Sequence, residues 1–566
     1  MSYYLKKTRL KGRTYLSIDE SFYSSKTKGT AHRVYKSLGS VETLKENGME
    51  DPVSFYQKEV DRLNEQAVSK TAQRIGESPI RFLGYFPLKS IMEKMTIPQF
   101  VRYFNLTNDF QFDLYDILSS LVFARAVCPC SKRKTFHDVI PCLCQSSDFS
   151  YNQLMNGLMF LGANYEKFVE LFTNRTMQHY PLNTKNLYFD CTNFYFEIDR
   201  EDDWRRKGPS KEQRKDPIIG MGLLLDGNQI PIGMKMYPGN QSEKPVIRDT
   251  ISYLKKRSNV TGRTIHVADK GLNCAENIFY SIADGDGYLF SKSVKTLPQI
   301  EKEWVLLENS DWHDVKDENG TLLYRYKSCV SVFPYSFVQK DGTVKEFSLE
   351  EKRVLTWSPS LEKKQRLEMD KLIEKAKTCS IARAKKSEYG EASKYVTFLP
   401  VRKTGEINDD DQVVATLNEK KIDQDKALLG YNLLVTSERK MTDKQIYEVY
   451  HNLWRIEESF RIMKSDLDAR PVYCQKIETI IGHFLICYIT VLLVRLFQLK
   501  ELNDEYSSSK IFEFMRDYRV IEVAGGYFNT ATKSEFITQL SEKTKLPLDH
   551  LNLTEKQVQK ILSYKF

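Results

Sequence analysis

One stretch of the chain places a single acid on a largely apolar helical stripe. Residues 446–464 contain no Pro or Gly, and their apolar residues recur at intervals of three and four, which predicts one helix with Thr442 and Asp443 suited to cap its start. One stripe of that helix carries Tyr450, Leu453, Glu457, Phe460 and Lys464. A carboxylate on the buried side of a helix costs free energy unless it is paired or bound to a metal. We therefore expect Glu457 to be a member of a buried ion pair, to lie simply at the rim of the apolar face, or to be a metal ligand whose partners lie elsewhere in the chain.

Two further acids are distinguished by their positions in predicted strands. Asp190 lies within an aromatic, β-rich run at 187–196, and Asp269 directly follows a short apolar strand at 264–268. Acids on neighbouring strands of an α/β domain can converge at one edge of the sheet, where ligand sites form. Taken alone, each aspartate is explained by a cap or a turn. In this order, and followed by Glu457, they predict a cluster of three carboxylates.

A cluster of three carboxylates needs a compensating charge. The negative groups repel one another, so the site requires a cation or shifted pKa values. Hard oxygen ligands favour Mg²⁺ or Mn²⁺, and two such ions roughly 4 Å apart are suited to phosphoryl transfer. We therefore expect Asp190, Asp269 and Glu457 to hold two Mg²⁺ (or Mn²⁺) ions.

The elements that position these acids alternate between strands and helices. The predicted strands are 187–196, 218–225, 230–237, 264–268, 287–291 and 431–436, with an Asp226-Gly227 hairpin turn and helices through about 254 and 283. An antiparallel opening followed by alternating strands and helices predicts an α/β domain with a mixed sheet. Residues 295–428 interrupt this order with β-like pieces and one charged helical stretch, which predicts an inserted, mainly β domain.

The remainder of the chain surrounds this core. The predicted regions are a basic N-terminal DNA-binding region (1–85), a helical domain (86–182), the α/β core (183–294 and 429–500), the β-rich insertion (295–428) and a C-terminal helical region (501–566). The N-terminal region is expected to contain short strands in 1–40 and a helix from 52 to 75, and 83–87 is expected to be a non-helical link. The apolar run at 480–494 is shorter than the roughly 20 residues of a spanning helix and contains His483, so it predicts a buried core helix.

Composition and charge narrow the class of protein. The 566 residues are 41% hydrophobic and 28% charged, as in soluble globular proteins, and carry a net charge of +9. The first forty residues hold nine Lys or Arg and two acids, which suits a polyanion such as DNA and equally a solvated surface hairpin. With ten cysteines and no secretory signal at its start, the chain is expected in a reducing cytoplasm with free thiols. The single residue between Cys128 and Cys130 disfavours the usual zinc spacing.

Several motifs in order give the chain a specific resemblance. They are Asp190-Cys191-Thr192, the segment Gly239-Asn240 to Glu243, Ala268-Asp269-Lys270-Gly271, and the helix from Tyr450 to Lys464. With these motifs the chain resembles the DDE transposases of bacterial insertion sequences, in the group with a Tyr-Arg-Glu-Lys signature. That signature spaces Tyr, Arg, Glu and Lys by two, three and six residues, and here Leu453 stands at the Arg position. Arg455 or Arg461 would make the phosphate contact that the Arg of the signature makes, or this chain lacks that contact.

The resemblance implies a fold, a reaction and partners. It implies a ribonuclease-H-like core with a mixed five-stranded sheet, interrupted by a β-rich insertion before the final Glu, and the 188 positions from Asp269 to Glu457 leave room for that insertion. It also implies binding to terminal inverted repeats, cleavage at the element ends, joining to target DNA, and a homodimer on paired ends. Asp190, Asp269 and Glu457 would be catalytic, and Tyr450 and Lys464 would contact DNA phosphate near the cleaved bond.

A basic loop lies between the first two predicted strands of the core. Because residues 205–214 follow the Asp190 strand, Lys211 and Arg214 are predicted to contact the DNA backbone. The same core also serves a nuclease or a domesticated recombinase that lacks strand transfer. A non-catalytic DNA-binding protein is the third function left open, and it rests on the basic N-terminus. In each case the expected location is the cytoplasm, on the nucleoid when bound to DNA.

Overall fold

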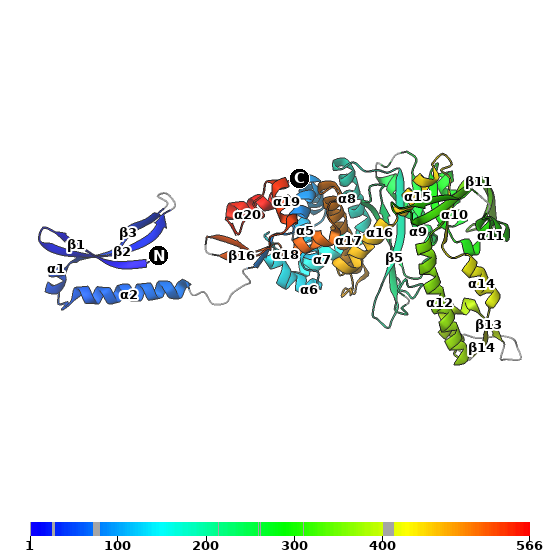
Figure 1. Ribbon diagram of the computed structural model, residues 1–566. Helices are drawn as coiled ribbons and strands as arrows, with labels where there is room; N and C mark the ends of the chain where they lie inside the picture. Colours follow the sequence, from blue (N-terminus) through cyan, green and yellow to red (C-terminus); the bar gives the residue numbers. More distant parts are fainter. Residues whose placement is uncertain are drawn as a thin grey trace. The chain divides into compact units, whose positions relative to one another are not determined.

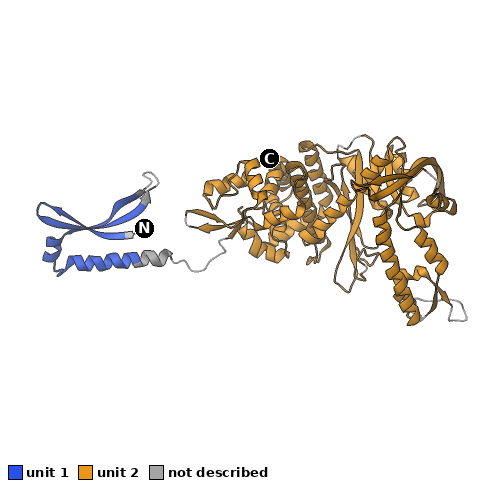
Figure 2. Ribbon diagram, viewed as in Figure 1, with its two compact units in different colours: residues 1–79 blue, residues 80–566 orange. Residues whose placement is uncertain are grey.

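The chain divides into two compact units, each described by itself. The computed structural model describes residues 2–24, 29–71, 80–145, 147–212, 214–258, 260, 262–308, 311–399, 413–523 and 525–566. The N-terminal unit comprises residues 1–79 and the larger unit residues 80–566 (Figure 2).

The N-terminal unit is a three-stranded antiparallel sheet with two helices. Its elements are β1 (Ser2–Leu10), β2 (Arg13–Ser24), β3 (Gly29–Ser40), α1 (Val41–Glu46) and α2 (Pro52–Thr71). The predicted turn at Lys11-Gly12 joins β1 to β2, and both residues have positive φ, which glycine adopts without strain. The strands predicted in 1–40 and the helix from Pro52 are confirmed. The predicted end of that helix, at 72–75, lies outside the described residues.

A mixed sheet of nine strands organises the larger unit. The strand order is β10-β11-β12-β15-β9-β8-β5-β6-β7. The core strands are β5 (Asn186–Tyr195), β6 (Ile218–Leu225), β7 (Pro231–Pro238), β8 (Ile265–Ala268), β9 (Gly287–Lys292) and β15 (Tyr431–Thr436). β5, β8 and β9 run parallel to one another, and the remaining pairings are antiparallel. The predicted mixed sheet is confirmed, but it has nine strands in place of the expected five.

The extra strands come from the insertion. β10 (His313–Lys316), β11 (Leu322–Val338) and β12 (Val344–Trp357) extend the core sheet, because β12 pairs with β15. Val354 and Leu355 of β12 are fully buried beside Leu433 and Leu434 of β15, so this pairing covers an apolar edge that β15 would otherwise expose. The expectation of a separate β domain is corrected in this respect: its main hairpin is part of the core sheet.

The rest of the insertion is mostly helical. It contains α11 (Gln299–Leu306), α12 (Pro359–Ile381), α13 (Lys386–Tyr389), α14 (Glu419–Ala427) and the two-stranded sheet of β13 (Val396–Leu399) and β14 (Val414–Leu417). Figure 1 shows α12, α14 and this small sheet grouped together beyond the core sheet. Met369 and Ile373 of α12 bury their side chains with Ile422 of α14 in a core of their own.

The helix predicted over 446–464 is instead two helices and a wider turn. α15 (Asp443–His451) begins at the predicted cap Thr442, and α16 (Trp454–Arg461) continues into a π-helical turn at Ile462–Asp466. The prediction of one helix is therefore wrong. At the junction the amide of Leu453 bonds to the carbonyl of Tyr450 at 3.0 Å, a tighter i to i+3 bond. Asn452, a weak helix former, occupies this turn.

A bundle around one apolar helix adjoins the sheet. It contains α3 (Phe86–Lys94), α4 (Ile97–Thr107), α5 (Leu114–Val127), α6 (Lys132–Lys134), α7 (Tyr151–Ala163) and α8 (Tyr165–His179), and α3, α5, α7 and α8 pack on α17 (Ile477–Leu496) (Figure 1). α7 and α17 approach closely because Gly162 and Gly482 face the backbone of the other helix, where a Cβ would collide. α3 begins at Phe86, one residue before the end of the link predicted at 83–87.

α17 confirms the predicted core helix. Among the described residues, the stretch Ile477–Glu501 is long and apolar enough to cross a membrane, but the 18 residues of its most apolar part are all buried inside the larger unit. His483 lies within it and is 4% exposed. Three further helices pack against the sheet. They are α9 (Lys244–Arg257) on β6 and β7, α10 (Ala275–Ala283) on β9 and β11, and α16 on β5.

The C-terminal region is mixed, whereas the sequence predicted a helical one. It contains α18 (Ser508–Asp517), β16 (Arg519–Val523), β17 (Gly526–Asn529), α19 (Glu535–Thr544), β18 (Asn552–Leu553) and α20 (Glu555–Leu562). Its strands form a four-stranded antiparallel sheet with β4 (Ile80–Phe82), in the order β18-β17-β16-β4. Val520 is fully buried at the centre of β16, so tertiary packing outweighs the weak helical pattern there.

Candidate active site

Asp190 and Asp269 lie on neighbouring parallel strands. In the pairing of β5 with β8, Phe189 is opposite Ala268, and each aspartate is the next residue along its strand direction. Since β8 ends at Ala268, Asp269 stands at the carboxyl end of that strand beside Asp190. The sheet therefore brings two of the three predicted acids together at one edge, where α/β proteins form ligand sites.

The charge of Asp190 is held in an unfavourable environment. Burial raises its pKa to about 6, and the nearby carboxylates of Glu243 and Asp269 act in the same direction. The ammonium of Lys211, 3.5 Å from Oδ1, and a 2.7 Å hydrogen bond from the amide of Cys191 oppose this rise. Asp190 is thus an acid that gains from additional positive charge.

Asp269 is oriented by two hydroxyl groups. Ser291, near the end of β9, donates to its Oδ1 at 2.8 Å, and Tyr450 of α15 donates to the same atom at 3.0 Å. Burial, together with the charge of Asp269, raises the pKa of Tyr450, so the phenol remains a donor. In the described part of the chain, Oδ2 of Asp269 receives no hydrogen bond, which leaves it available to a ligand.

Glu457 is exposed on α16, a helix that packs against β5. Tyr450, seven residues before it, reaches Asp269, and Lys464, seven residues after it, has its Nζ 5.6 Å from the ring centre of Phe194 on β5. In the sequence, Glu457 therefore lies midway between a residue that contacts Asp269 and a residue that contacts β5. Across the described ranges, however, no group of three or more His, Cys, Asp or Glu side chains is arranged to hold a metal ion. The structure joins Asp190 with Asp269 and leaves Glu457 on the adjoining helix.

The cations predicted to meet DNA lie around these acids and are engaged with protein groups. Lys211 contacts Asp190 and the carbonyl of Cys191, and Lys464 donates to Glu212 at 3.4 Å. The guanidinium of Arg214 lies 3.9 Å from the ring centre of Tyr195.

The two arginines considered as substitutes at the Leu453 position are also paired. Arg455 bonds to Asp504 at 2.7 Å, and Arg461 bonds to the hydroxyl of Ser508 at 3.0 Å and lies 3.6 Å from Asp466. DNA contacts from either arginine remain predictions, and both would have to exchange these partners for phosphate.

Comparison with known proteins identifies the family. The family described as transposase DDE domain matches residues 189–493, which is more than half of the chain. The chain belongs to the transposase DDE domain family. No curated protein sequence matches it. A solved structure, the piggyBac transposase synaptic complex with hairpin DNA, is similar over 80% of this chain and 76% of that chain, at 10% identity and a TM-score of 0.36.

Three residues of this transposase site were not assigned roles from the sequence. Glu243 acts on Asp190 through its charge, Ser291 fixes Asp269, and Glu212 binds both Lys464 and Arg470. Glu243 stands in a quoted motif, and Ser291 ends a predicted strand, so both had a positional signal. No sequence pattern indicated a role for Glu212, because its partners Lys464 and Arg470 lie more than 250 residues away in the sequence.

The donor type of these residues fits a divalent cation, although the described side chains are not arranged as a group of three or more around one. Asp190, Asp269, Glu243 and Glu457 supply hard oxygen donors, the ligand type that Mg²⁺ and Mn²⁺ prefer. Burial is the main cause of the raised pKa of Asp190, repulsion from Glu243 and Asp269 adds to it, and the ammonium of Lys211 already places one positive charge there. A bound ion would relieve the same repulsion.

Removing the charge of Asp190 should stabilise the metal-free transposase. Its pKa is raised to about 6 from 3.8, so the folded protein holds the proton more tightly than the unfolded chain. Stability therefore falls as pH rises between these values, and the penalty is complete above pH 6. Asp190→Asn should remove that penalty and raise the free energy of unfolding at neutral pH by about 3 kcal/mol at most.

Urea unfolding in EDTA measures this effect. The gain should be present at neutral pH and absent at a pH below the ordinary value of an aspartate. Asp423→Asn, at an exposed position of α14, is the matched control and should change little at either pH. A loss of stability in Asp190→Asn at neutral pH would contradict the electrostatic account of the site.

Proposed function

We propose that this transposase binds the terminal inverted repeats of an insertion sequence, cleaves DNA at the element ends, and joins the freed 3′-hydroxyl ends to target DNA. The observation that carries the proposal is the family match over 189–493, which includes Asp190, Asp269 and Glu457, together with the placement of both aspartates at one edge of the sheet. The strand order β7-β6-β5-β8-β9 supports a ribonuclease-H-like core for this chemistry.

The three acids have a common role in this proposal. Asp190, Asp269 and Glu457 would hold two Mg²⁺ ions, which when bound activate the attacking oxygen and stabilise the leaving oxygen of a phosphodiester. Tyr450 and Ser291 fix the orientation of Asp269, and Glu457 approaches from α16.

The proposed reaction consists of two phosphoryl transfers. In the first, water attacks the phosphorus at the element end, the bond from phosphorus to the 3′-oxygen breaks, and a proton leaves to solvent. The products are a 3′-hydroxyl on the element and a 5′-phosphate on the flanking DNA. In the second, that 3′-oxygen attacks a target phosphodiester, so one phosphodiester forms as another breaks. The route of second-strand cleavage is left outside the proposal.

Positive side chains around the site support a DNA substrate. Lys211, Arg214 and Lys464 surround the sheet edge near Asp190, and DNA phosphates would compete with the acids that now pair with them. The basic N-terminal unit would add sequence-independent affinity, and a homodimer would hold the paired ends. Leu453 distinguishes the chain from the Tyr-Arg-Glu-Lys signature, so membership of that group is proposed without its Arg contact.

One experiment separates the proposed function from its alternatives. The purified protein is incubated with a linear donor carrying both flanks of its gene and a supercoiled target plasmid, in Mg²⁺ or in EDTA. A transposase should produce nicks at the element ends and donor–target joints in Mg²⁺ but not in EDTA. Cleavage without joints would favour a nuclease or a domesticated recombinase. Binding without either product, unaffected by EDTA, would favour a non-catalytic DNA-binding protein.

A further inference from the structure

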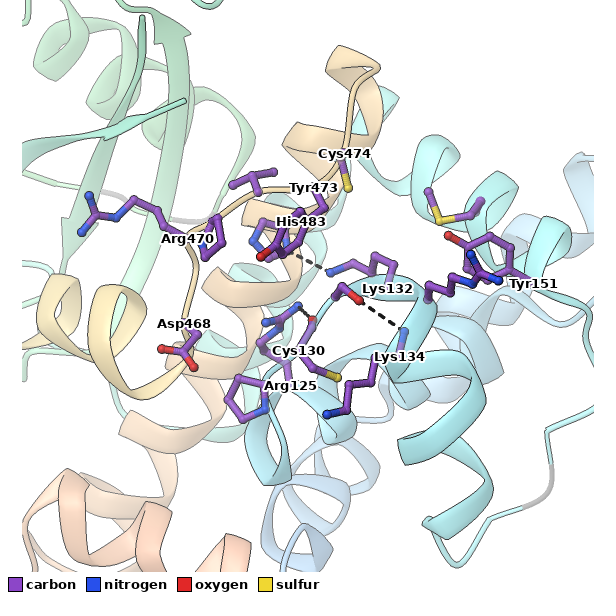
Figure 3. Close-up of a pocket in the computed structure, with 16 residues that line it drawn as sticks. Arg125, Cys130, Lys132, Lys134, Tyr151, Asp468, Arg470, Tyr473, Cys474 and His483 are labelled. Atoms are coloured by element: carbon purple, nitrogen blue, oxygen red, sulfur yellow. Dashed lines mark hydrogen bonds between the residues drawn. The ribbon is translucent and has the colours of Figure 1, made fainter. Parts of the chain in front are cut away.

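A basic pocket lies between the helical bundle and the segment that follows α16. It is a cavity of about 780 Å³ whose lining combines residues 129–134 around α6 with residues 468–474 and with His483 of α17. Figure 3 shows side chains from these three segments turned toward a common space. Five Lys or Arg residues line the cavity, and Asp468 is the acid among its lining residues. The lining of the pocket therefore has an excess of basic side chains.

Two of these cations are buried without an acidic partner. Lys132 is 7% exposed and Arg125 is 5% exposed, and in the described part of the chain neither lies within 4.0 Å of a carboxylate. Arg125 donates to the carbonyls of Leu467 and Cys130. An unpaired buried charge costs several kcal/mol, so proteins rarely retain one for stability.

The contact that Lys132 makes leaves its charge uncompensated. Its Nζ donates to Nδ1 of His483 at 2.9 Å (Figure 3), while Nε2 of His483 donates to the carbonyl of Ala469 at 3.0 Å. Burial holds the pKa of His483 well below its usual range, so the ring is a neutral acceptor. Burial, with a smaller contribution from Arg125, lowers the pKa of Lys132 to about 7. An anion in the pocket would supply the missing negative charge.

A second cavity adjoins this pocket on the side of β5. A neighbouring cavity of about 480 Å³ shares the residues from Arg470 to Cys474 and is lined on its other side by Lys464, Arg205 and Tyr195 of β5. Arg470 lies between the two cavities, 4.5 Å from the ring centre of Tyr195 and bonded to Glu212. Cationic side chains thus follow one another from the Asp190 strand to Lys132. This arrangement fits a chain of phosphates better than a single small anion.

We propose that the Lys132 pocket binds a backbone phosphate of DNA whose neighbouring phosphates pass Arg470 and Lys464 on the way to the catalytic acids. The inference rests on the proposed function and deepens it by naming a contact between the helical bundle and the substrate. Lys132 and Arg125 form the base of the pocket, and the exposed Arg133 and Lys134 form its rim. A DNA strand held here would join the bundle to the catalytic core.

Replacing Lys132 with methionine separates a ligand role from a structural one. Lys132→Met should weaken binding of a fluorescein-labelled DNA duplex of mixed sequence roughly ten-fold in EDTA, and reduce the slope of log affinity against log salt by about 1. The melting temperature should stay the same or rise, because an unpaired buried charge is replaced by an apolar side chain. Lys132→Arg should retain most of the affinity and the slope. Lys556→Met, the same change at an exposed lysine of α20, should alter neither affinity nor slope.

Acetylation of the unmodified protein provides a test that does not depend on a variant. Acetic anhydride should modify Lys132 in the free protein, and mass spectrometry should find that the duplex protects Lys132 but not Lys556. Unchanged affinity and slope in Lys132→Met, or undiminished acetylation of Lys132 at saturating duplex, would overturn the proposal. Protection by inorganic phosphate equal to that by duplex would overturn the assignment to DNA.

The outcomes distinguish this inference from the proposed function. A protein that binds duplex through Lys132 but neither cuts nor joins DNA retains the pocket and refutes the transposition reaction. A protein that cuts and joins DNA while Lys132→Met binds normally retains the reaction and refutes the pocket.

Discussion

Glu457→Gln should abolish Mg²⁺-dependent cleavage while leaving DNA binding and thermal stability unchanged. The amide keeps the size of the side chain but loses the charge that a cation requires. Groups that act as one catalytic unit lose about 10⁴-fold or more in rate when one member is removed. Stability should not change, because Glu457 is exposed on α16.

The next residue offers a matched control for this prediction. Glu458 has the same side chain one position along α16, but its carboxylate is already paired, 2.9 Å from Arg495 and 3.5 Å from Arg455. Glu458→Gln should therefore keep the cleavage rate per folded molecule and lose stability. The assay compares nicking of a labelled element end in Mg²⁺ with binding of the same end in EDTA.

The opposite result would assign the catalytic role to a different glutamate. If Glu457→Gln cleaves normally and Glu458→Gln does not, the catalytic glutamate is Glu458 and the spacing from Tyr450 differs from the family signature by one residue. If both variants cleave normally, the third carboxylate comes from elsewhere, and Glu243 beside Asp190 is the first residue to test.

The sequence predicted that Asp190 and Asp269 lie close together, because their positions depend on local patterns. A buried strand is recognisable from its apolar run, and an acid at or near its end must lie at the edge of the sheet. Asp269 satisfies this rule because it directly follows β8, and the parallel register then places Asp190, in the middle of β5, beside it. Glu457 was found by helical spacing, which survives the break at Asn452 since both residues of the turn keep helical backbone angles.

The size of the sheet could not be predicted in the same way. A strand pattern shows that a segment is extended, but it does not identify the partner strand. β12 pairs with β15, although Lys352 and its partner Thr436 are far apart in the sequence, and that pairing converts a predicted β insertion into an extension of the core. Similarly, β4 at the start of the larger unit pairs with β16 near the end of the sequence, so the C-terminal region could not be recognised as part of a sheet.

The ion pairs around the site could not be predicted from the sequence either. Basic residues near the predicted site suggested DNA contacts, yet the structure pairs Lys464 and Arg470 with Glu212, and Arg455 with Asp504. These pairs connect different elements, so no i to i+4 pattern indicates them. The pairing sharpens the functional prediction, because DNA must exchange phosphate for these carboxylates and binding should weaken steeply with salt.

Glu458→Ala should be among the most destabilising substitutions in the larger unit. Arg495 is fully buried in α17, and its Nη1 bonds to Glu458 at 2.9 Å and to Gln498 at 2.7 Å. In the described part of the chain, Nε and Nη2 of Arg495 have no hydrogen-bond partner. Burial lowers the pKa of Arg495, and the charge of Glu458 opposes that effect. Without Glu458, a guanidinium would remain buried with a single amide partner.

The expected loss follows from the cost of an unpaired buried charge. Removing one member of a buried ion pair typically costs about 3–5 kcal/mol, and Glu458 is 12% exposed, so solvent screens little of this interaction. Urea unfolding followed by circular dichroism measures the change. Glu457→Ala, on the exposed side of the same turn, is the matched control and should change the free energy of unfolding by less than about 0.5 kcal/mol.

A double variant distinguishes charge from lost packing. Glu458→Met combined with Arg495→Met removes both charges and fills similar volume, so it should be more stable than Glu458→Ala alone by a large part of the loss. If the double variant is as unstable as the single one, the helix contact depends on shape, and the buried charge of Arg495 is not its determinant. If Glu458→Ala unfolds like the wild type, Arg495 is compensated by Gln498 alone, and the pair with Glu458 has no structural role.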